Sequence, residues 1–144
     1  MDCDSPRSVA LLSVQPKYAT QVLNGTKGVE FRRKRFKLDV DWIVVYASSP
    51  VRKITGYFSV REIVEGTPAE IWELYSSVGG IDEADYHAYF EGSSKAFAIV
   101  VQKAVRLRNA LELDRVLTAG TVPQSYKYLS EQEFATLLKC SLAS

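Results

Sequence analysis

Histidine and cysteine are almost absent from this sequence of 144 residues. The single histidine, His87, lies in an acidic segment, and the two cysteines, Cys3 and Cys140, lie near opposite ends of the chain. A zinc site needs three or four ligands, largely from these residue types, and a Ser-His-Asp triad needs an oriented histidine base. We therefore expect no metal ion, no disulfide framework and no triad, and we interpret His87 as a surface residue of a helix.

Several other motifs are missing as well. The sequence has neither a phosphate-binding P-loop nor the glycine pattern of dinucleotide-binding folds, so we expect no cofactor. Its first residues lack the basic start and apolar run of a secretory signal, and no stretch approaches the roughly 20 apolar residues of a membrane helix. No repeat, low-complexity segment or long linker divides the chain. We expect one cytoplasmic domain over residues 1–144, with a core at about 9–138, tails at 1–7 and 140–144, and no contact with a membrane.

Charge is present but unevenly distributed. Residues 1–61 hold 11 Lys and Arg against 5 Asp and Glu, whereas residues 62–91 hold 8 acidic residues and no Lys or Arg. The net charge of +1 therefore hides a basic region beside an acidic one. A basic face attracts phosphate whatever the overall charge, because salt screens each patch beyond about 10 Å.

Apolar runs predict more strands than helices. The continuous runs Val9–Val14 and Trp42–Ala47 predict buried strands, and a third strand is predicted at Val29–Phe36. Alternating patterns predict strands at Lys53–Arg61 and Ala96–Leu107. Gly56 falls on the apolar side of its strand, which indicates a bulge or a close backbone approach.

The predicted helices are short and have clear ends. One begins at Pro16 and ends at Gly25, and three others begin at the capping residues Thr67, Asp82 and Ser130. With so many strands and such short helices, we expect an α+β fold, a small twisted, partly closed β-barrel decorated with helices.

The segment 24–35 (NGTKGVEFRRKR) carries the strongest local signal. Lys27 follows a helix that stops at Gly25, where free backbone amides and the absence of a side chain suit an anion. In the strand that follows, Arg32 and Arg33 point to opposite faces, so we expect one to be inward and tied to Glu30 or a ligand, and the other solvated. The alternative is a solvated basic edge strand that guards against aggregation.

The order of several short stretches resembles the ASCH domain family of the PUA-like group. The run 12–19 (LSVQPKYA), then 22–27 (VLNGTK), then 29–33 (VEFRR) is similar to the opening of these domains, in which a Gly-x-Lys turn precedes a Glu-Phe-Arg-type strand. Stretches 46–50, 54–58 and 123–129 resemble the ASCH branch of predicted transcriptional regulators. The resemblance covers roughly residues 9–130, and the ordered set is more specific than the turn alone.

The resemblance implies a PUA-like barrel with a cleft lined by the Gly-x-Lys turn, the strand of Arg32 and loops at the barrel mouth. Members of this group bind RNA, some ASCH proteins cleave RNA, and others remove an acetyl group from acetylated cytidine with a lysine, a threonine and a glutamate. Lys27 matches that lysine, but Glu30 stands at the threonine position, and the glutamate would fall near residues 78–80, which lack a carboxylate. Only a relocated acid such as Glu62 or Glu65 would restore the scheme.

We therefore expect an RNA- or nucleotide-binding domain with a basic cleft, in which Lys27, Glu30, Arg32 and Tyr46 converge and Lys27 is an exposed turn residue. A metal-independent ribonuclease in the same cleft, an amidohydrolase acting on acetylated cytidine, and a non-catalytic protein-interaction domain are the alternatives. Single-stranded RNA or a nucleoside is the expected ligand, with catalysis by Lys27 and Glu30. The expected binding residues are Lys17, Lys27, Arg32, Arg33, Tyr46, Ser48, Ser125 and Tyr126.

Overall fold

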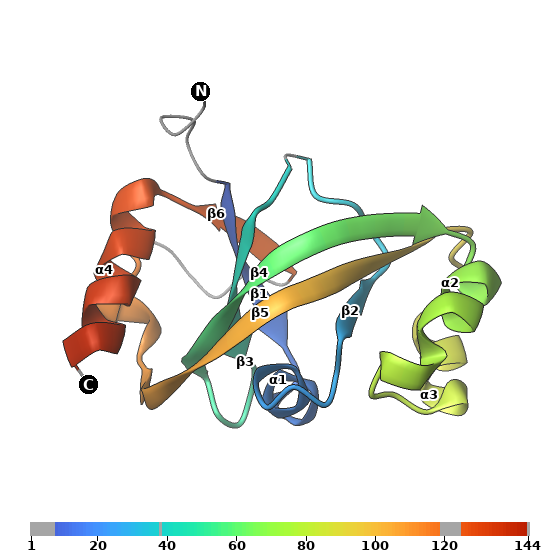
Figure 1. The fold of residues 1–144 in the computed structure, drawn as a ribbon, viewed down its shortest axis with the longest axis horizontal. Helices are drawn as coiled ribbons and strands as arrows, with labels where there is room; N and C mark the ends of the chain where they lie inside the picture. Colours follow the sequence, from blue (N-terminus) through green and yellow to red (C-terminus); the bar gives the residue numbers. More distant parts are fainter. Residues whose placement is uncertain (1–7, 38, 119–124, 144) are drawn as a thin grey trace.

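The computed structural model describes residues 8–37, 39–118 and 125–143, and for residues 142 and 143 it describes the backbone only. A six-stranded sheet with the order β2-β5-β4-β3-β1-β6 curls into a half-barrel (Figure 1), which confirms the predicted α+β fold. All its neighbouring strands are antiparallel except β1 and β3, which are parallel. The strands are β1 (Val9–Val14), β2 (Val29–Arg32), β3 (Trp42–Ala47), β4 (Lys53–Gly66), β5 (Ala96–Leu111) and β6 (Tyr126–Leu129).

The two edge strands differ from the prediction. β2 ends at Arg32 rather than at residue 36, and β6 is a strand that the sequence pattern did not indicate. Phe36 turns inward instead of continuing β2, and its ring lies 4.7 Å from that of Tyr126, edge to face. Tertiary packing therefore decides both ends, since four residues carry too little pattern to predict a strand.

β4 and β5 form a long, irregular pair at the centre of the sheet. Their pairing shifts between Ile54 and Gly56, as the glycine predicted. A Cβ atom on Gly56 would lie 2.5 Å from the carbonyl oxygen of Val105 and 2.7 Å from the methyl groups of Leu23. Glycine at this position therefore lets the first helix pack directly on the strand.

In the described part of the chain, four α-helices cover the sheet: α1 (Pro16–Leu23), α2 (Pro68–Tyr75), α3 (Glu83–Tyr89) and α4 (Glu131–Ala143), with 3-10 turns at Ser76–Val78 and Leu113–Arg115. The predicted caps at Thr67 and Asp82 are confirmed. Thr67 and Glu70 form a capping box, and the Asp82 carboxylate accepts a hydrogen bond from the backbone N–H of Asp85. α4 extends past residue 138, the expected end of the core. Among the described helices, none is both long and apolar enough to cross a membrane.

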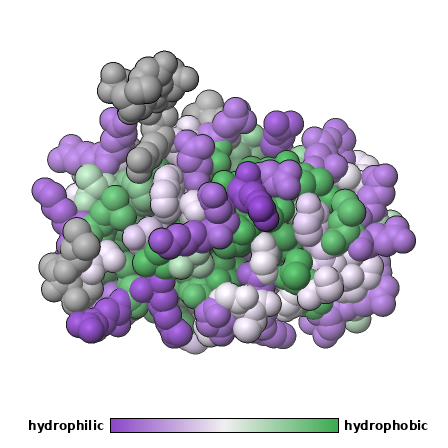
Figure 2. Space-filling model, in the orientation of Figure 1, coloured by the Kyte–Doolittle hydropathy of each residue, from purple (hydrophilic) through white to green (hydrophobic). Residues whose placement is uncertain are grey.

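The two faces of the sheet carry separate apolar cores. One face packs Leu12, Ile43 and Phe58 against α1, and the other packs Leu11 and Val44 towards α4. A third core fixes α2 and α3 against the outer end of the sheet, at the right of Figure 1. On the face shown in Figure 2, hydrophilic side chains ring the outline of the molecule and hydrophobic ones show between them.

Glu133 closes the capping box of α4 and predicts a pH dependence of stability. It is 8% exposed, and it accepts from the backbone N–H of Ser130 at 2.8 Å and from that of Thr118 at 3.1 Å. Burial acts to raise its pKa, but these hydrogen bonds outweigh burial and lower the pKa. A lowered folded-state pKa stabilises the fold above the unfolded pKa, and that stability is lost as pH falls through the folded one.

We therefore expect Glu133→Gln to lower the free energy of unfolding by about 1 kcal/mol at neutral pH and by less near pH 3. Thermal unfolding at both pH values measures the difference. Glu131→Gln, an exposed change in the same helical turn, is the control. A loss of stability in Glu133→Gln that is as large at acid pH as at neutral pH would contradict the role of the carboxylate.

Candidate functional site

Lys27 is buried, so the expectation of an exposed turn lysine is wrong. After α1, Gly25 adopts a φ of 87° and the chain reverses, which sends Lys27 back beneath the helix with 3% of its surface exposed. Its ammonium group donates to the carbonyl oxygen of Gly79 and lies 5.1 Å from the ring centre of Tyr18 and 4.9 Å from that of Phe31. Burial lowers the pKa of Lys27, and the negative charge of Glu30 opposes that shift.

Glu30 is the second buried charge of this region. It lies on β2, is 7% exposed, and its Oε2 atom is 3.5 Å from Nη1 of Arg32. Burial raises the pKa of the Glu30 carboxyl, whereas the charges of Lys27 and Arg32 act to lower it. A buried carboxyl whose pKa is raised above the ordinary glutamate value is a candidate group for accepting and returning a proton.

Arg32 joins the two edges of the half-barrel. Its Nη2 atom donates to Oγ of Ser125, just before β6, at 2.8 Å, and its Nη1 atom lies 3.5 Å from the carbonyl oxygen of Ser13 on β1. The seam between the edge strands β2 and β6 is thus bridged by a guanidinium group. We call Lys27, Glu30, Arg32 and Ser125 the seam cluster.

Arg33 points the other way, as strand alternation predicts. Its side chain is exposed, and its guanidinium carbon lies 5.0 Å from the ring centre of Tyr89 on α3. The expectation that one arginine is tied to Glu30 and the other solvated is confirmed, with Arg32 as the inward one.

Tyr46 does not join the seam cluster, which corrects the expected convergence. Residues alternate along β3, so Val45 faces the α1 core while Tyr46 faces the α4 core, where it is 3% exposed. There it lines a pocket of about 420 Å³ together with Arg52 and Asp114. The sequence WIVVYA does not show which residues face which side, because both faces of this strand are buried and apolar.

The other expected binding residues are scattered. Tyr126 lies beside the seam, with its ring 5.4 Å from that of Tyr128. Lys17 is exposed on α1, and its ammonium group lies 5.4 Å from the ring centre of Tyr18. Ser48 lies in the turn after β3, where its backbone N–H donates a hydrogen bond to the carbonyl oxygen of Val14. The structure therefore brings together Lys27, Glu30, Arg32, Ser125 and Tyr126, and leaves the rest apart.

Tyr18 is a neighbour of the cluster that the sequence did not single out. Its pKa is raised, first by burial and then by the negative charges of Asp85, Asp82 and Glu30. Its ring covers the ammonium group of Lys27. The only sequence signal was its helical spacing in α1, which indicates packing rather than a site.

The segment 78–80 approaches Lys27, where the resemblance places the amidohydrolase glutamate. It supplies the carbonyl oxygen of Gly79, not a carboxylate, and Gly80 packs against the Lys27 stem. Glu65 does not replace the missing acid, because it is paired with Lys95 at 2.9 Å and Arg35 at 3.8 Å. A backbone carbonyl does not transfer protons, so this geometry disfavours amidohydrolase chemistry.

The seam cluster therefore contains the kinds of side chain that anion binding and proton transfer require. Arg32 is 16% exposed at its side chain and Ser125 is exposed, so both offer hydrogen-bond donors at the surface. Glu30 is buried 3.5 Å from Arg32, and the buried Lys27 is close enough for its charge to act on Glu30. Within the described ranges, no group of three or more His, Cys, Asp and Glu side chains is placed to hold a metal ion.

Comparison with known proteins yields one family. The model of the ASCH domain matches residues 12–108. The chain is 32% identical over 136 residues to an ASCH domain-containing ribonuclease of Zymomonas mobilis, covering 92% of this chain and 91% of that one. It is also 33% identical to a Ureaplasma parvum protein named large ribosomal subunit protein uL22, covering 83% of this chain but only 38% of that protein.

Solved structures agree on the fold. The crystal structure of the Zymomonas mobilis ASCH protein superimposes with a TM-score of 0.84 at 30% identity, covering 91% of this chain and 94% of that one. The N-terminal domain of Staphylothermus marinus McrB superimposes with a TM-score of 0.58 at 11% identity, over 91% and 93% of the two chains. The second likeness concerns the fold alone.

Proposed function

The chain belongs to the ASCH domain family, and on that premise we propose that it binds single-stranded RNA at the seam cluster and cleaves it there without a metal ion. One observation carries the proposal: a buried carboxyl with a raised pKa lies against an arginine that reaches the surface. The Zymomonas mobilis relative named as a ribonuclease supports the choice of RNA as substrate. The cytoplasm is the compartment that we assign to this activity.

The proposed reaction uses the 2′-hydroxyl group of the RNA itself. Arg32 and Ser125 hold the phosphate, and the Glu30 carboxylate takes the proton of the 2′-hydroxyl, whose oxygen attacks phosphorus. The bond from phosphorus to the 5′-oxygen breaks, and the protonated Glu30 returns its proton to that oxygen. The products are a 2′,3′-cyclic phosphate and a free 5′-hydroxyl. Arg32 and Lys27 stabilise the negative charge that develops on the phosphorane.

The test is the cleavage of short single-stranded RNAs in the presence of a metal chelator. We expect cleavage products that end in a cyclic phosphate, and no cleavage at a position where one 2′-deoxy nucleotide replaces the ribonucleotide. Acetylated cytidine, incubated in parallel, is expected to remain intact. Cleavage that stops on chelation, or that proceeds at the 2′-deoxy position, would rule out this mechanism.

Binding is measured separately, because a domain that only binds would give no products. Affinity for RNA should fall with salt, with a logarithmic slope near 0.7 per phosphate contacted. Arg32→Ala should reduce that slope, and Arg33→Ala, one residue away on the other face, is the matched control. RNA binding without cleavage would reduce the function to a binding domain, and no binding at low salt would favour a protein-interaction domain.

A further inference from the structure

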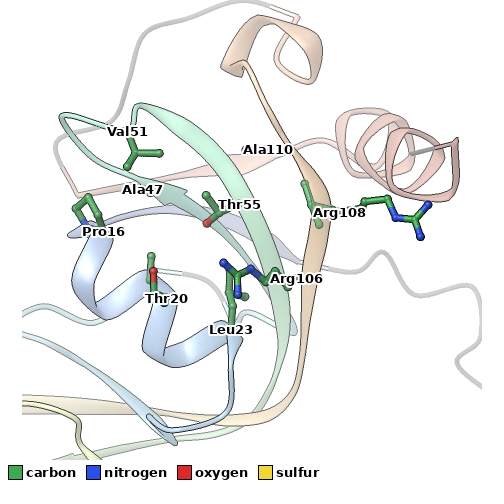
Figure 3. A pocket seen from close by; sticks show the side chains of 11 residues that line it. Pro16, Thr20, Leu23, Ala47, Val51, Thr55, Arg106, Arg108 and Ala110 are labelled. Carbon is green, nitrogen blue, oxygen red and sulfur yellow. The ribbon is translucent and has the colours of Figure 1, made fainter.

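A second pocket, with mixed polar and apolar walls, lies on the other flank of α1 from the seam cluster. It has a volume of about 230 Å³ and is enclosed by α1, the turn between β3 and β4, and β5 (Figure 3). Thr20 and Leu23 of α1 line it, whereas Tyr18 on the same helix covers Lys27. The pocket is therefore separate from the proposed cleavage site, with one helix between them.

An irregularity in the sheet creates this pocket. Ile54 pairs with Leu111 and Gly56 pairs with Arg106, so four residues of β5 bow out opposite the single residue Thr55. Bulges of this kind are frequent beside binding sites, where they re-aim side chains. Here the bulge places Thr55 in the wall of the pocket, with its hydroxyl oxygen almost fully covered (Figure 3).

The Thr55 hydroxyl group is buried and has no hydrogen-bond partner among the residues that the structure describes. A buried hydroxyl without a partner is costly, which makes it a candidate contact for a ligand. The hydroxyl of Thr20 faces the same space from α1, and the guanidinium group of Arg106 points into it from β5 (Figure 3). The structure records no ion pair between Arg106 and any acidic residue in the described part of the chain.

The remaining walls are apolar. Ala19 and Leu23 form one side, and Ala47 and Val51 form another. The volume lies below the roughly 300–1,000 Å³ of sites for drug-sized ligands, which suits one small ring better than an extended molecule. Apolar walls accept the faces of a ring, two hydroxyls can donate to or accept from its polar edge, and an exposed arginine at the rim suits a phosphate.

We propose that this pocket is a nucleotide subsite that takes one nucleobase between α1 and the β3–β4 turn, with its phosphate on Arg106. The chemistry fits both a nucleotide of a bound RNA and a free mononucleotide. The inference deepens the proposed function, because unstacked bases of single-stranded RNA are available to enter such pockets. Phosphate contacts set position, whereas the contact of Thr55 with the base edge would set sequence preference.

The experiment measures the affinity of short homopolymer RNAs and of nucleoside 5′-monophosphates for the wild type, Arg106→Ala, Thr55→Val and Arg108→Ala. We expect Arg106→Ala to weaken RNA binding roughly tenfold for all sequences. Thr55→Val should change the order of preference among the homopolymers and leave the salt dependence unaltered. Arg108→Ala is the matched control, because Arg108 lines the pocket near its backbone but its guanidinium group extends away from it (Figure 3).

Thermal unfolding separates binding from folding. Thr55→Val replaces an unpartnered hydroxyl with a methyl group of similar shape, so it should fold at least as stably as the wild type while its preference changes. Equal affinities for Arg106→Ala and Arg108→Ala, together with an unchanged homopolymer order in Thr55→Val, would overturn the subsite.

The two ligand sources and the two proposals are also distinguishable. An effect of Arg106→Ala on RNA places an RNA nucleotide in the pocket, and an effect confined to monophosphates places a free nucleotide there. Because only binding is measured, an Arg106-dependent affinity without cleavage supports the subsite while refuting the ribonuclease. If RNA is cleaved but neither Arg106→Ala nor Thr55→Val changes the affinity for any ligand, the subsite is refuted and the ribonuclease proposal stands.

Discussion

Glu30→Gln is expected to reduce the rate of RNA cleavage by a factor of at least about 100 and to leave RNA affinity nearly unchanged. The glutamine keeps the shape of the side chain and a hydrogen-bonding oxygen for Arg32, but it cannot take the 2′-hydroxyl proton. Arg32 retains its contact with Ser125 at 2.8 Å, so phosphate binding persists. Single-turnover cleavage and equilibrium binding, measured on the same RNA, separate the two effects.

The pH dependence of the wild type gives a second readout of the same group. Burial raises the pKa of Glu30, so the carboxylate form that acts as base appears only above the usual glutamate range, about pH 4.3. The cleavage rate should therefore rise with pH through an apparent pKa above that value. Glu65→Gln, an exposed change on β4, is the control and should leave rate and profile unaltered. A Glu30→Gln variant with wild-type cleavage would remove Glu30 from the mechanism.

Lys27→Met is expected to lower both stability and the cleavage rate. A turn lysine in solvent would contribute less than about 0.5 kcal/mol to folding, but the burial of Lys27 changes that expectation. Methionine keeps the length of the side chain but leaves the Gly79 carbonyl oxygen without its donor, which costs about 1–3 kcal/mol. If Lys27 stabilises the phosphorane as we propose, loss of its charge should slow cleavage roughly a hundredfold or more.

Chemical denaturation measures the first effect, and the cleavage rate of the folded fraction measures the second. Lys17→Met, on the exposed side of α1, removes the same charge and should change neither. A folded Lys27→Met variant with the full rate would exclude the Gly-x-Lys turn as the functional centre. Attention would then move to Ser125 and Tyr126.

Local sequence determined the features that depend on neighbouring residues. The capping boxes at Thr67 and Ser130 form as predicted, because each needs only two side chains three residues apart. The bulge at Gly56 and the opposite orientations of Arg32 and Arg33 follow from strand alternation. The order of short stretches also sufficed to indicate the ASCH family, since it combines several motifs along most of the chain.

Only the tertiary structure decided which of these residues meet. Arg32 and Ser125 are 93 positions apart and come together because the half-barrel brings its two edge strands to one seam. Tyr46 faces the α4 core, since a strand buried on both faces gives no apolar alternation from which its side can be read. Lys27 is buried because the segment 78–80 folds over it with a carbonyl oxygen. Such long-range contacts depend on how the layers pack, which no local pattern encodes.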